Sequence, residues 1–287
     1  MGIITYFAAV LLGWAELPVM PAAEEVRYVT HWVSADGKAA AAPDDPGRVR
    51  NYTVAWDVAR MQPLWVAYPM HPWYDGDAGR SNSWRPDPAV DREQQPDLRR
   101  SYQPVGDHGR YSRGHMLASD SRQRSMAMNR QTFHFTNSAP QTQNAFNAGI
   151  WLKLENLEKE WGLRGGAGIT DTLWVVTGST FQSGYRLVTT DDAGNTIPVP
   201  THFYKAMLTT RGKGVGKPVS ECSADELRCV VFYLQHLGHP TGARPGPQHM
   251  MSVDDLERVT GIDFFPMIAP EAECVESRYD PAEWGMQ

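Results

Sequence analysis

The stretch that most constrains the fold runs from Tyr111 to Trp161, because it joins two short strand patterns to one long helix pattern. The first strand pattern is YSRGHMLASD and the second is TFHFTNSAPQ. In the helix pattern, apolar residues recur at steps of three and four, and at about 100° per residue they fill one arc of about 80°. These residues are Phe146, Ile150, Leu154, Leu157 and Trp161. We therefore predict strand, strand and helix in this order, with one face of the helix buried.

Alternating stretches on both sides of this unit predict further strands. VRYVTHWV, NYTVAW and LWVAYPM precede it, and LWVVTGSTF, PVPTHFYKAMLTT and CVVFYLQHL follow it. Their period of two, bounded by Gly, Pro and Asp, is typical of strands. Ser252 precedes a helix pattern as its N-cap. The sequence thus predicts an α+β fold with a central antiparallel sheet flanked by helices.

The 287 residues contain no linker that forces a split, so we predict a single domain over residues 14–270. Residues 271–287 are acidic and are expected to form a peripheral tail. Residues 1–13 include an apolar run with no preceding Lys or Arg, too short for a bilayer-spanning helix of about 20 residues. We interpret this run as a truncated or atypical export signal, with a core strand or helix as the alternative. This interpretation predicts a secreted or periplasmic protein without stable membrane insertion.

The three cysteines lack a zinc-ligand spacing and are too few for a disulfide framework. An exported protein would suit a bridge between Cys222 and Cys229, with Cys274 free. Reduced, buried thiols are the alternative, and the sequence leaves both open.

One constellation in the central stretch suits phosphodiester hydrolysis. His115 has the side chain whose ordinary pKa lets it take a proton near neutral pH. Arg113 lies two residues earlier, on the same face of a regular strand, where its cation can meet phosphate oxygens. Asn147 offers an amide oxygen, the kind of ligand that Mg²⁺ accepts while keeping several waters. Glu155 lies about 12 Å further along the helix, so we expect it to act through waters or by orienting a cation.

These residues lie in motifs that resemble the DNA/RNA non-specific endonucleases of the ββα-metal (His-Me finger) superfamily. The family's signature is Asp-Arg-Gly-His, then Asn-x-x-Pro-Gln, then Asn-x-Gly-x-Trp-x-x-Leu-Glu. The corresponding segments here are Ser112-Arg113-Gly114-His115, Asn137-Ser-Ala-Pro140-Gln141 and Asn147-Ala-Gly149-Ile-Trp151-Leu-Lys-Leu154-Glu155. The likeness extends from about Trp14 to Pro266.

The resemblance implies a role for each matching residue. His115 would be the general base and Asn147 the metal ligand, with Arg113 and Glu155 as further catalytic residues. Asn137 is implied as a supporting residue that orders the site. The implied cofactor is Mg²⁺, with Mn²⁺ as a substitute, and the implied substrates are DNA and RNA, cut to leave 5′-phosphate ends.

The chain departs from the family pattern at two places. Ser112 stands where the family has Asp, which we expect to change the surroundings of the base but not its presence. The arginine expected before the Trp84 element is missing, and Arg80 and Arg85 are the two candidates to contact the substrate phosphate in its place.

Charge distribution and the retained residues bear on what the chain does. The formal net charge is −6, yet residues 80–130 contain ten Arg and six Asp or Glu, which makes this part locally basic. A catalytically silent binding module is the alternative, and retention of both His115 and Asn147 argues against it. A metal-dependent phosphodiesterase for small substrates would need a closed pocket. The sequence leaves open the preference between DNA and RNA, the oligomeric state and the existence of an inhibitor protein.

Overall fold

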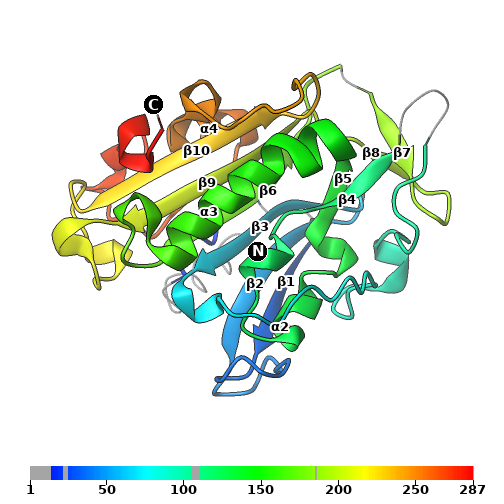
Figure 1. Ribbon diagram of the computed structural model, residues 1–287, viewed down its shortest axis with the longest axis horizontal. Coiled ribbons are helices and arrows are strands. Elements are labelled where there is room, and N and C mark those ends of the chain that lie inside the picture. The colour runs from blue at the N-terminus through cyan, green and yellow to red at the C-terminus, as the bar shows by residue number, and fades with distance from the viewer. Residues whose placement is uncertain (1–13, 22–24, 105–109, 185, 287) are drawn as a thin grey trace.

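A seven-stranded antiparallel sheet organises the protein (Figure 1). The computed structural model describes residues 14–21, 25–104, 110–184 and 186–286, so the expected export signal at residues 1–13 lies outside the described residues. The strand order is β1-β2-β3-β6-β9-β10-β11, and each neighbouring pair is antiparallel. The strands are β1 (Val26–Val33), β2 (Val49–Asp57), β3 (Gln62–Met70), β6 (Leu173–Thr180), β9 (His202–Thr210), β10 (Leu227–Gln235) and β11 (Met250–Met251). The predicted α+β fold with a central antiparallel sheet is confirmed.

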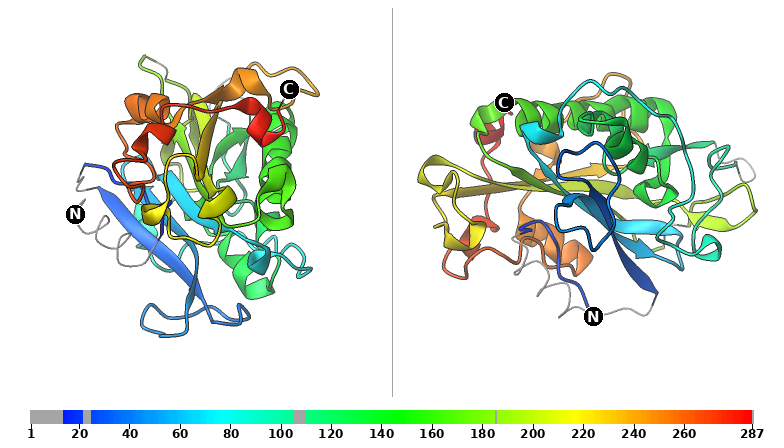
Figure 2. Two further views of the ribbon diagram at one scale, coloured as in Figure 1. Left: turned by 90° about the vertical axis from the view of Figure 1, so that its left-hand side faces the viewer. Right: turned by 90° about the horizontal axis from the view of Figure 1, so that it is seen from below.

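Both faces of the sheet are covered, so its inner strands β3, β9 and β10 are buried along most of their length, whereas the edge strand β1 alternates between buried and more exposed positions. Side chains alternate between the faces. Val66 and Tyr68 belong to the core beneath α3 (Leu152–Arg164), whereas Trp65 and Ala67 belong to the core beneath α4 (Val253–Thr260). Figure 2 shows these two helices on opposite sides of the strands. As predicted, Ser252 caps α4, since its hydroxyl accepts a hydrogen bond from the backbone N–H of Asp255.

The central stretch forms a hairpin that lies on the α3 side of the sheet. β4 (Tyr111–His115) pairs with β5 (Ser138–Thr142), and α2 (Met126–Gln131) lies in the connection between them. Two short 3₁₀ turns, Ser119–Ser121 and Phe135–Asn137, flank α2. The second strand therefore begins later than its sequence pattern predicts.

The helix after the hairpin is not the regular α-helix that the sequence predicts. Residues Gln143–Trp151 form a wide π-helical segment with a kink at Gly149 (φ −107°, ψ −115°), and α3 begins only at Leu152. Because a π-helix has more residues per turn than an α-helix, the residues of this segment do not continue the buried and exposed faces of α3. Trp151, the last residue of this segment, is fully buried. π-helical bulges occur often at functional sites.

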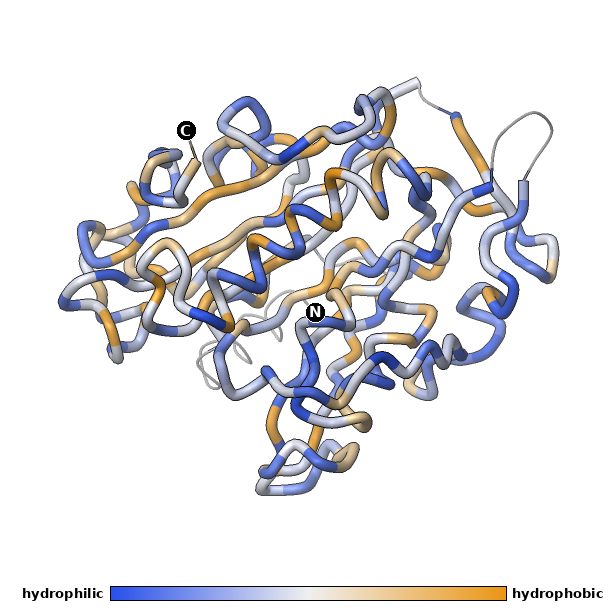
Figure 3. The backbone as a smooth tube through the Cα atoms, viewed as in Figure 1, coloured by the Kyte–Doolittle hydropathy of each residue, from blue (hydrophilic) through white to orange (hydrophobic). Residues whose placement is uncertain are grey.

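The long connection between β3 and β4 runs along the outside of the hairpin and is polar over much of its length (Figure 3). It is anchored by backbone bridges between Arg85 and His134 and between Gln103 and Thr190. A small third sheet, β7 (Val188–Thr190) with β8 (Thr196–Pro198), supports its later part. The remaining short helical turns are Pro72–Tyr74, Arg92–Gln94, Gly166–Gly168, Gly212–Gly214, Val219–Glu221, Pro247–His249, Glu273–Val275 and Pro281–Trp284.

The segment after residue 270 is not the peripheral tail that its acidic composition predicts. Trp284 is fully buried, and its ring centroid lies 5.4 Å from that of Trp161 on α3. The guanidinium of Arg228 lies over the same ring at 5.0 Å. Apolar residues spaced among the acidic ones, such as Ala272 and Val275, enter the core, so the average charge of the segment was misleading.

Two other expectations concern cysteines and membranes. Cys222, Cys229 and Cys274 all lie within the described ranges and are free, which matches the reduced-thiol alternative and not the bridge. Burial raises the pKa of the thiols of Cys222 and Cys229. Among the residues that the structure describes, none of the helices has both the length and the apolar character needed to cross a bilayer.

His236 connects the large sheet to the start of the π-helical segment. Its Nε2 accepts from the backbone N–H of Thr142 at 2.9 Å, and its Nδ1 donates to the carbonyl of Pro200 at 2.8 Å. Both bonds require the neutral ring. Burial lowers the pKa of His236 to about 4, with smaller contributions from His239 and His202.

We therefore expect His236 to make the fold acid-labile. An unfolded histidine titrates near 6.5, so the stability contributed by the neutral ring is present above that pH and is lost as the pH falls through about 4. In urea denaturation, the stability difference between wild type and His236→Gln should be larger at pH 7 than at pH 4.5, by about 2 kcal/mol. The exposed His71→Gln is the matched control. A difference that does not change with pH would contradict this account.

Candidate active site

One cavity of about 200 Å³ contains most of the residues that the sequence singled out. Its lining includes Arg80, Arg113, His115, Asn147 and Glu155. These residues come from the long connection, from β4, from the π-helical segment and from α3. Asn137 lies behind the cavity, and Arg85 lines a different one.

His115 lies at the end of β4 with its ring nine-tenths buried. Its ring centroid is 4.6 Å from that of Trp84 and 5.0 Å from that of Phe133. Burial lowers the pKa of His115 to about 3, and the nearby guanidiniums of Arg80 and Arg113 lower it further. The ring is therefore neutral at physiological pH. Its Nε2 is buried and has no hydrogen-bond partner in the described ranges. A neutral imidazole has one nitrogen with a free lone pair, so the ring as a whole can accept a proton.

Two residues of the family motifs, Gly114 and Asn137, have structural roles next to His115. A Cβ at Gly114 would come within 2.1 Å of the side chain of Gln141, so the glycine lets that side chain cross the strand. The Asn137 amide accepts from the N–H of Leu117 at 2.9 Å and donates to the carbonyls of Leu117 and Thr132. Asn137 thereby fixes the segment that directly follows His115. The supporting role implied for Asn137 in catalysis stays a prediction.

Two arginines border the cavity, and the side chain of each is held in place. The Arg113 guanidinium donates to the carbonyl of Leu98 at 2.7 Å and lies 4.9 Å from the ring of Trp84. The Arg80 guanidinium donates to Ser119 and Asn82 at 2.6 and 2.8 Å. Burial lowers the pKa of each arginine side chain, but both stay cationic.

Of the two arginine candidates, the structure brings only Arg80 to the cavity of His115. Arg85 is held by backbone bonds to Phe133 and Phe135 and is exposed on another side. Sequence reasoning quoted Trp84 but missed its contact with His115. The sequence feature that could have indicated this contact is a large aromatic residue within a polar, arginine-rich loop.

Ser112 takes part in positioning Asn147. The Ser112 hydroxyl donates to the Oε1 of Gln143, and this same oxygen accepts from the Nδ2 of Asn147 at 3.2 Å. With its Nδ2 engaged in this bond, the Asn147 amide has its Oδ1 as the atom for binding a cation. The replacement of Asp by Ser at position 112 thus connects through Gln143 to Asn147, the predicted metal ligand.

The oxygen donors of the cavity fit a hard divalent cation. Asn147 supplies an amide oxygen and Glu155 a carboxylate, both of which Mg²⁺ accepts. Burial raises the pKa of Glu155 to about 8, with opposing effects from the charges of Lys205 and Glu158. A cation would therefore offset the burial of the Glu155 carboxylate.

A buried ion pair lies beneath this cavity. The Lys205 ammonium is 2.6 Å from the Glu158 carboxylate, and both side chains are fully buried. Lys205 also donates to Tyr68 at 2.8 Å and to Thr177 at 3.0 Å. Its ammonium lies 5.0 Å from the ring of Trp151, whose Nε1 donates to the carbonyl of His115.

Comparison with known proteins decides the family. The family model described as DNA/RNA non-specific endonuclease matches residues 37–271, which is most of the chain. The chain belongs to the DNA/RNA non-specific endonuclease family. The resemblance carried by the histidine, asparagine and glutamate motifs is thereby confirmed.

Relatives of this endonuclease family come from animals and bacteria. The protein named "Nuclease EXOG, mitochondrial" from Danio rerio is 29% identical over 232 residues, which cover 76% of this chain and 60% of the relative. The protein named "Nuclease" from Nostoc sp. strain PCC 7120 is 26% identical over 83% of this chain and 80% of its own length. The chain thus spans about three fifths of the zebrafish relative.

A solved structure supports the fold. The chain of the EndoG/EndoGI complex superposes with a TM-score of 0.58 and 22% identity, covering 87% of this chain and 89% of that chain. The predicted ββα-metal nuclease fold is confirmed by this likeness.

The expectation of a secreted or periplasmic protein is wrong. Four relatives, including the one from Danio rerio, are named mitochondrial nucleases. The expectation was based on the apolar run within residues 1–13. An apolar run of this length is not specific to export signals.

The buried ion pair generates a stability prediction. Lys205→Met keeps the length of the side chain but leaves the Glu158 carboxylate buried without its partner, which should cost about 3–5 kcal/mol. The double variant Lys205→Met/Glu158→Leu should recover most of this loss. Urea denaturation of the three proteins measures both effects. A loss below about 1 kcal/mol in the single variant would show that the pair contributes little.

Proposed function

We propose that this protein is a Mg²⁺-dependent endonuclease that hydrolyses phosphodiester bonds of DNA and RNA. The observation that carries the proposal is a buried, neutral His115 in one cavity with two cations and two oxygen donors. An uncharged base, positive charge and a cation-binding pair are what hydrolysis of an anionic diester needs.

In this proposal, the neutral imidazole of His115 takes the proton from the attacking water. The ring is uncharged at neutral pH and can therefore accept a proton, because a protonated ring would already carry one. Arg113 and Arg80 bind the phosphate oxygens and stabilise the negative charge that develops on them. Their bonds to Leu98, Ser119 and Asn82 hold both guanidiniums before the substrate arrives.

Asn147 and Glu155 would hold the divalent ion. When bound, Mg²⁺ supplies charge stabilisation to the phosphoryl group and to the departing 3′ oxygen. Ser112 and Gln143 keep the Asn147 amide in its orientation. Departure of the 3′ oxygen leaves a 5′-phosphate on the product.

Low selectivity for base and sugar follows from the same set of side chains. Arginines that contact phosphate fix the position of the backbone but carry no sequence information. The cavity beside them is small, so we propose that it holds the scissile phosphate and not a whole nucleotide.

The first test is digestion of supercoiled plasmid and of structured RNA, with Mg²⁺ or EDTA, by wild type and by His115→Asn. Wild type should cut both substrates only with the metal. Loss of the base should lower the rate by at least about 100-fold. The polar Asn limits the packing damage, and thermal melting checks that the variant folds.

Either of two results would count against this proposal. Failure of the folded wild type to cut with Mg²⁺ or Mn²⁺ would favour a silent binding module. Cutting that persists unchanged in the His115 variant would remove His115 from the role of base.

A matched pair of arginine variants tests how the site contacts phosphate. Arg80→Ala should lower kcat/KM by about 100-fold, because it removes a held cation next to His115. Arg85→Ala should stay within about threefold of wild type, since Arg85 lies outside this cavity. Steady-state cleavage of a short fluorescent duplex measures both. Equal losses in the two variants would argue for a diffuse charge effect.

A further inference from the structure

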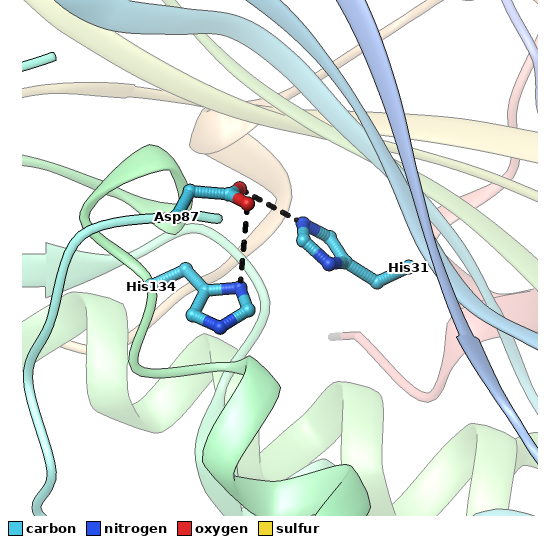
Figure 4. A group of neighbouring side chains, drawn as sticks. All are labelled: His31, Asp87 and His134. Atoms are coloured by element: carbon cyan, nitrogen blue, oxygen red, sulfur yellow. Dashed lines mark hydrogen bonds and ion pairs between the residues drawn. The ribbon is translucent and has the colours of Figure 1, made fainter. Parts of the chain in front are cut away.

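Three side chains that are far apart in the sequence meet outside the proposed catalytic cavity (Figure 4). His31 extends from β1, Asp87 from the long connection, and His134 from the residue before the turn that leads into β5. His31 Nε2 lies 3.0 Å from one oxygen of Asp87, and His134 Nδ1 lies 3.8 Å from the other. The ligand atoms of all three residues lie within 4.8 Å of one another.

The Asp87 carboxylate is held in a fixed orientation. Its Oδ1 accepts from the backbone N–H of Ala89 at 3.0 Å, and its Oδ2 accepts from the hydroxyl of Thr136. Its side chain is fully buried. Outer bonds of this kind orient carboxylates that bind metal ions.

His134 distinguishes a metal site from a simple hydrogen-bond cluster around Asp87. Its side chain is 4% exposed, and its Nδ1 has no hydrogen-bond partner in the part of the chain that the structure describes. The 3.8 Å separation from Asp87 is too long for a hydrogen bond. Buried polar atoms are almost always paired. The unpaired Nδ1 of His134 is therefore explained if a bound ion lies between it and the Asp87 carboxylate.

The donors indicate the class of ion. Two imidazole nitrogens and a carboxylate oxygen suit Zn²⁺ and similar transition metals, whereas Mg²⁺ prefers oxygen donors alone. In a tetrahedral zinc site with bonds of 2.0–2.1 Å, ligand atoms lie about 3.3 Å apart. The separations of 3.0 and 3.8 Å, which are measured to different oxygens of Asp87, lie on either side of this value, and one ligand atom from each of the three residues lies within 4.8 Å of the others. We propose that His31, Asp87 and His134 bind one divalent transition-metal ion of the Zn²⁺ class.

The surroundings leave room for a fourth ligand. His31 and His134 line a cavity of about 760 Å³ that is large enough to hold water molecules, whereas Asp87 is fully buried and does not line it. Arg85 and Pro86 lie on the wall of the same cavity. Three protein ligands and one water complete a tetrahedral site.

This ion would have a different task from the Mg²⁺ proposed at Asn147. It would join β1, the long connection and the segment before β5 at one point. Trp84 lies three residues before Asp87, and its ring packs on His115 at 4.6 Å. The ion would therefore stabilise one wall of the candidate active site without contacting the substrate.

Metal content of the full chain tests the proposal. Purified protein is stripped of metal, incubated with Zn²⁺ in excess Mg²⁺, desalted and measured by mass spectrometry of the metal. Wild type should retain about one Zn²⁺ per chain, and its melting temperature should rise on loading. His134→Gln and His31→Gln should each lose the retained ion and the rise.

The control is the double variant His239→Gln/His249→Gln, which removes a more exposed histidine pair whose rings lie 6.1 Å apart. It should keep the ion. No retention in wild type, full retention in both His134→Gln and His31→Gln, or loss in the control variant would each overturn the proposal.

A measurement on wild type alone covers the case in which the variants do not fold. X-ray absorption of the Zn²⁺-loaded protein should show two imidazoles among four nitrogen or oxygen ligands, and any other count of imidazoles would overturn the proposal. All of these readouts are independent of nuclease activity, so they stand whether or not the proposed function holds.

Discussion

The ammonium of Lys205 is the point on which the arrangement of this protein depends. It connects four parts of the molecule, through Glu158 on α3, Tyr68 on β3, Thr177 on β6 and the carbonyl of Met116 just after β4. A buried charge is costly unless its partners are held in place, so these partners define one relative position of helix, sheet and hairpin. The relative position of the candidate active-site residues depends on these contacts, because His115 is the last residue of β4 and Glu155 lies one turn before Glu158 on α3.

Much of the fold could be predicted because side chains that face the core recur at regular intervals in the sequence, every two residues in a strand and every three or four in a helix. Six of the seven strands of the large sheet and the cap at Ser252 follow local rules and were found where those rules placed them, whereas the two-residue strand β11 was not predicted. Local rules failed where tertiary packing outweighs them. The π-helical segment with its kink at Gly149 has the apolar spacing of a regular helix, and Trp284 is buried within an acidic segment.

In the candidate site, too, some features could be predicted from the sequence and others depend on tertiary packing. Its motif residues, among them His115 and Asn147, could be selected from the sequence because their order matched a known signature. The choice between Arg80 and Arg85 could not, since it depends on how the long connection folds back over the hairpin. His31, Asp87 and His134 have no common spacing, and their meeting depends on the pairing of β1 and the bridge at Arg85. The roles of all these residues in catalysis or metal binding stay predictions.

The burial of Trp284 against Trp161 has a consequence for how the protein is made. A chain leaves the ribosome from its N-terminus, and domains fold as units when their residues become available. The core beneath α3 lacks one of its largest fully buried side chains until synthesis has passed residue 284. The helix that carries Glu155 and Glu158 is therefore completed in its packing only late, after every residue of the proposed catalytic cavity has already emerged.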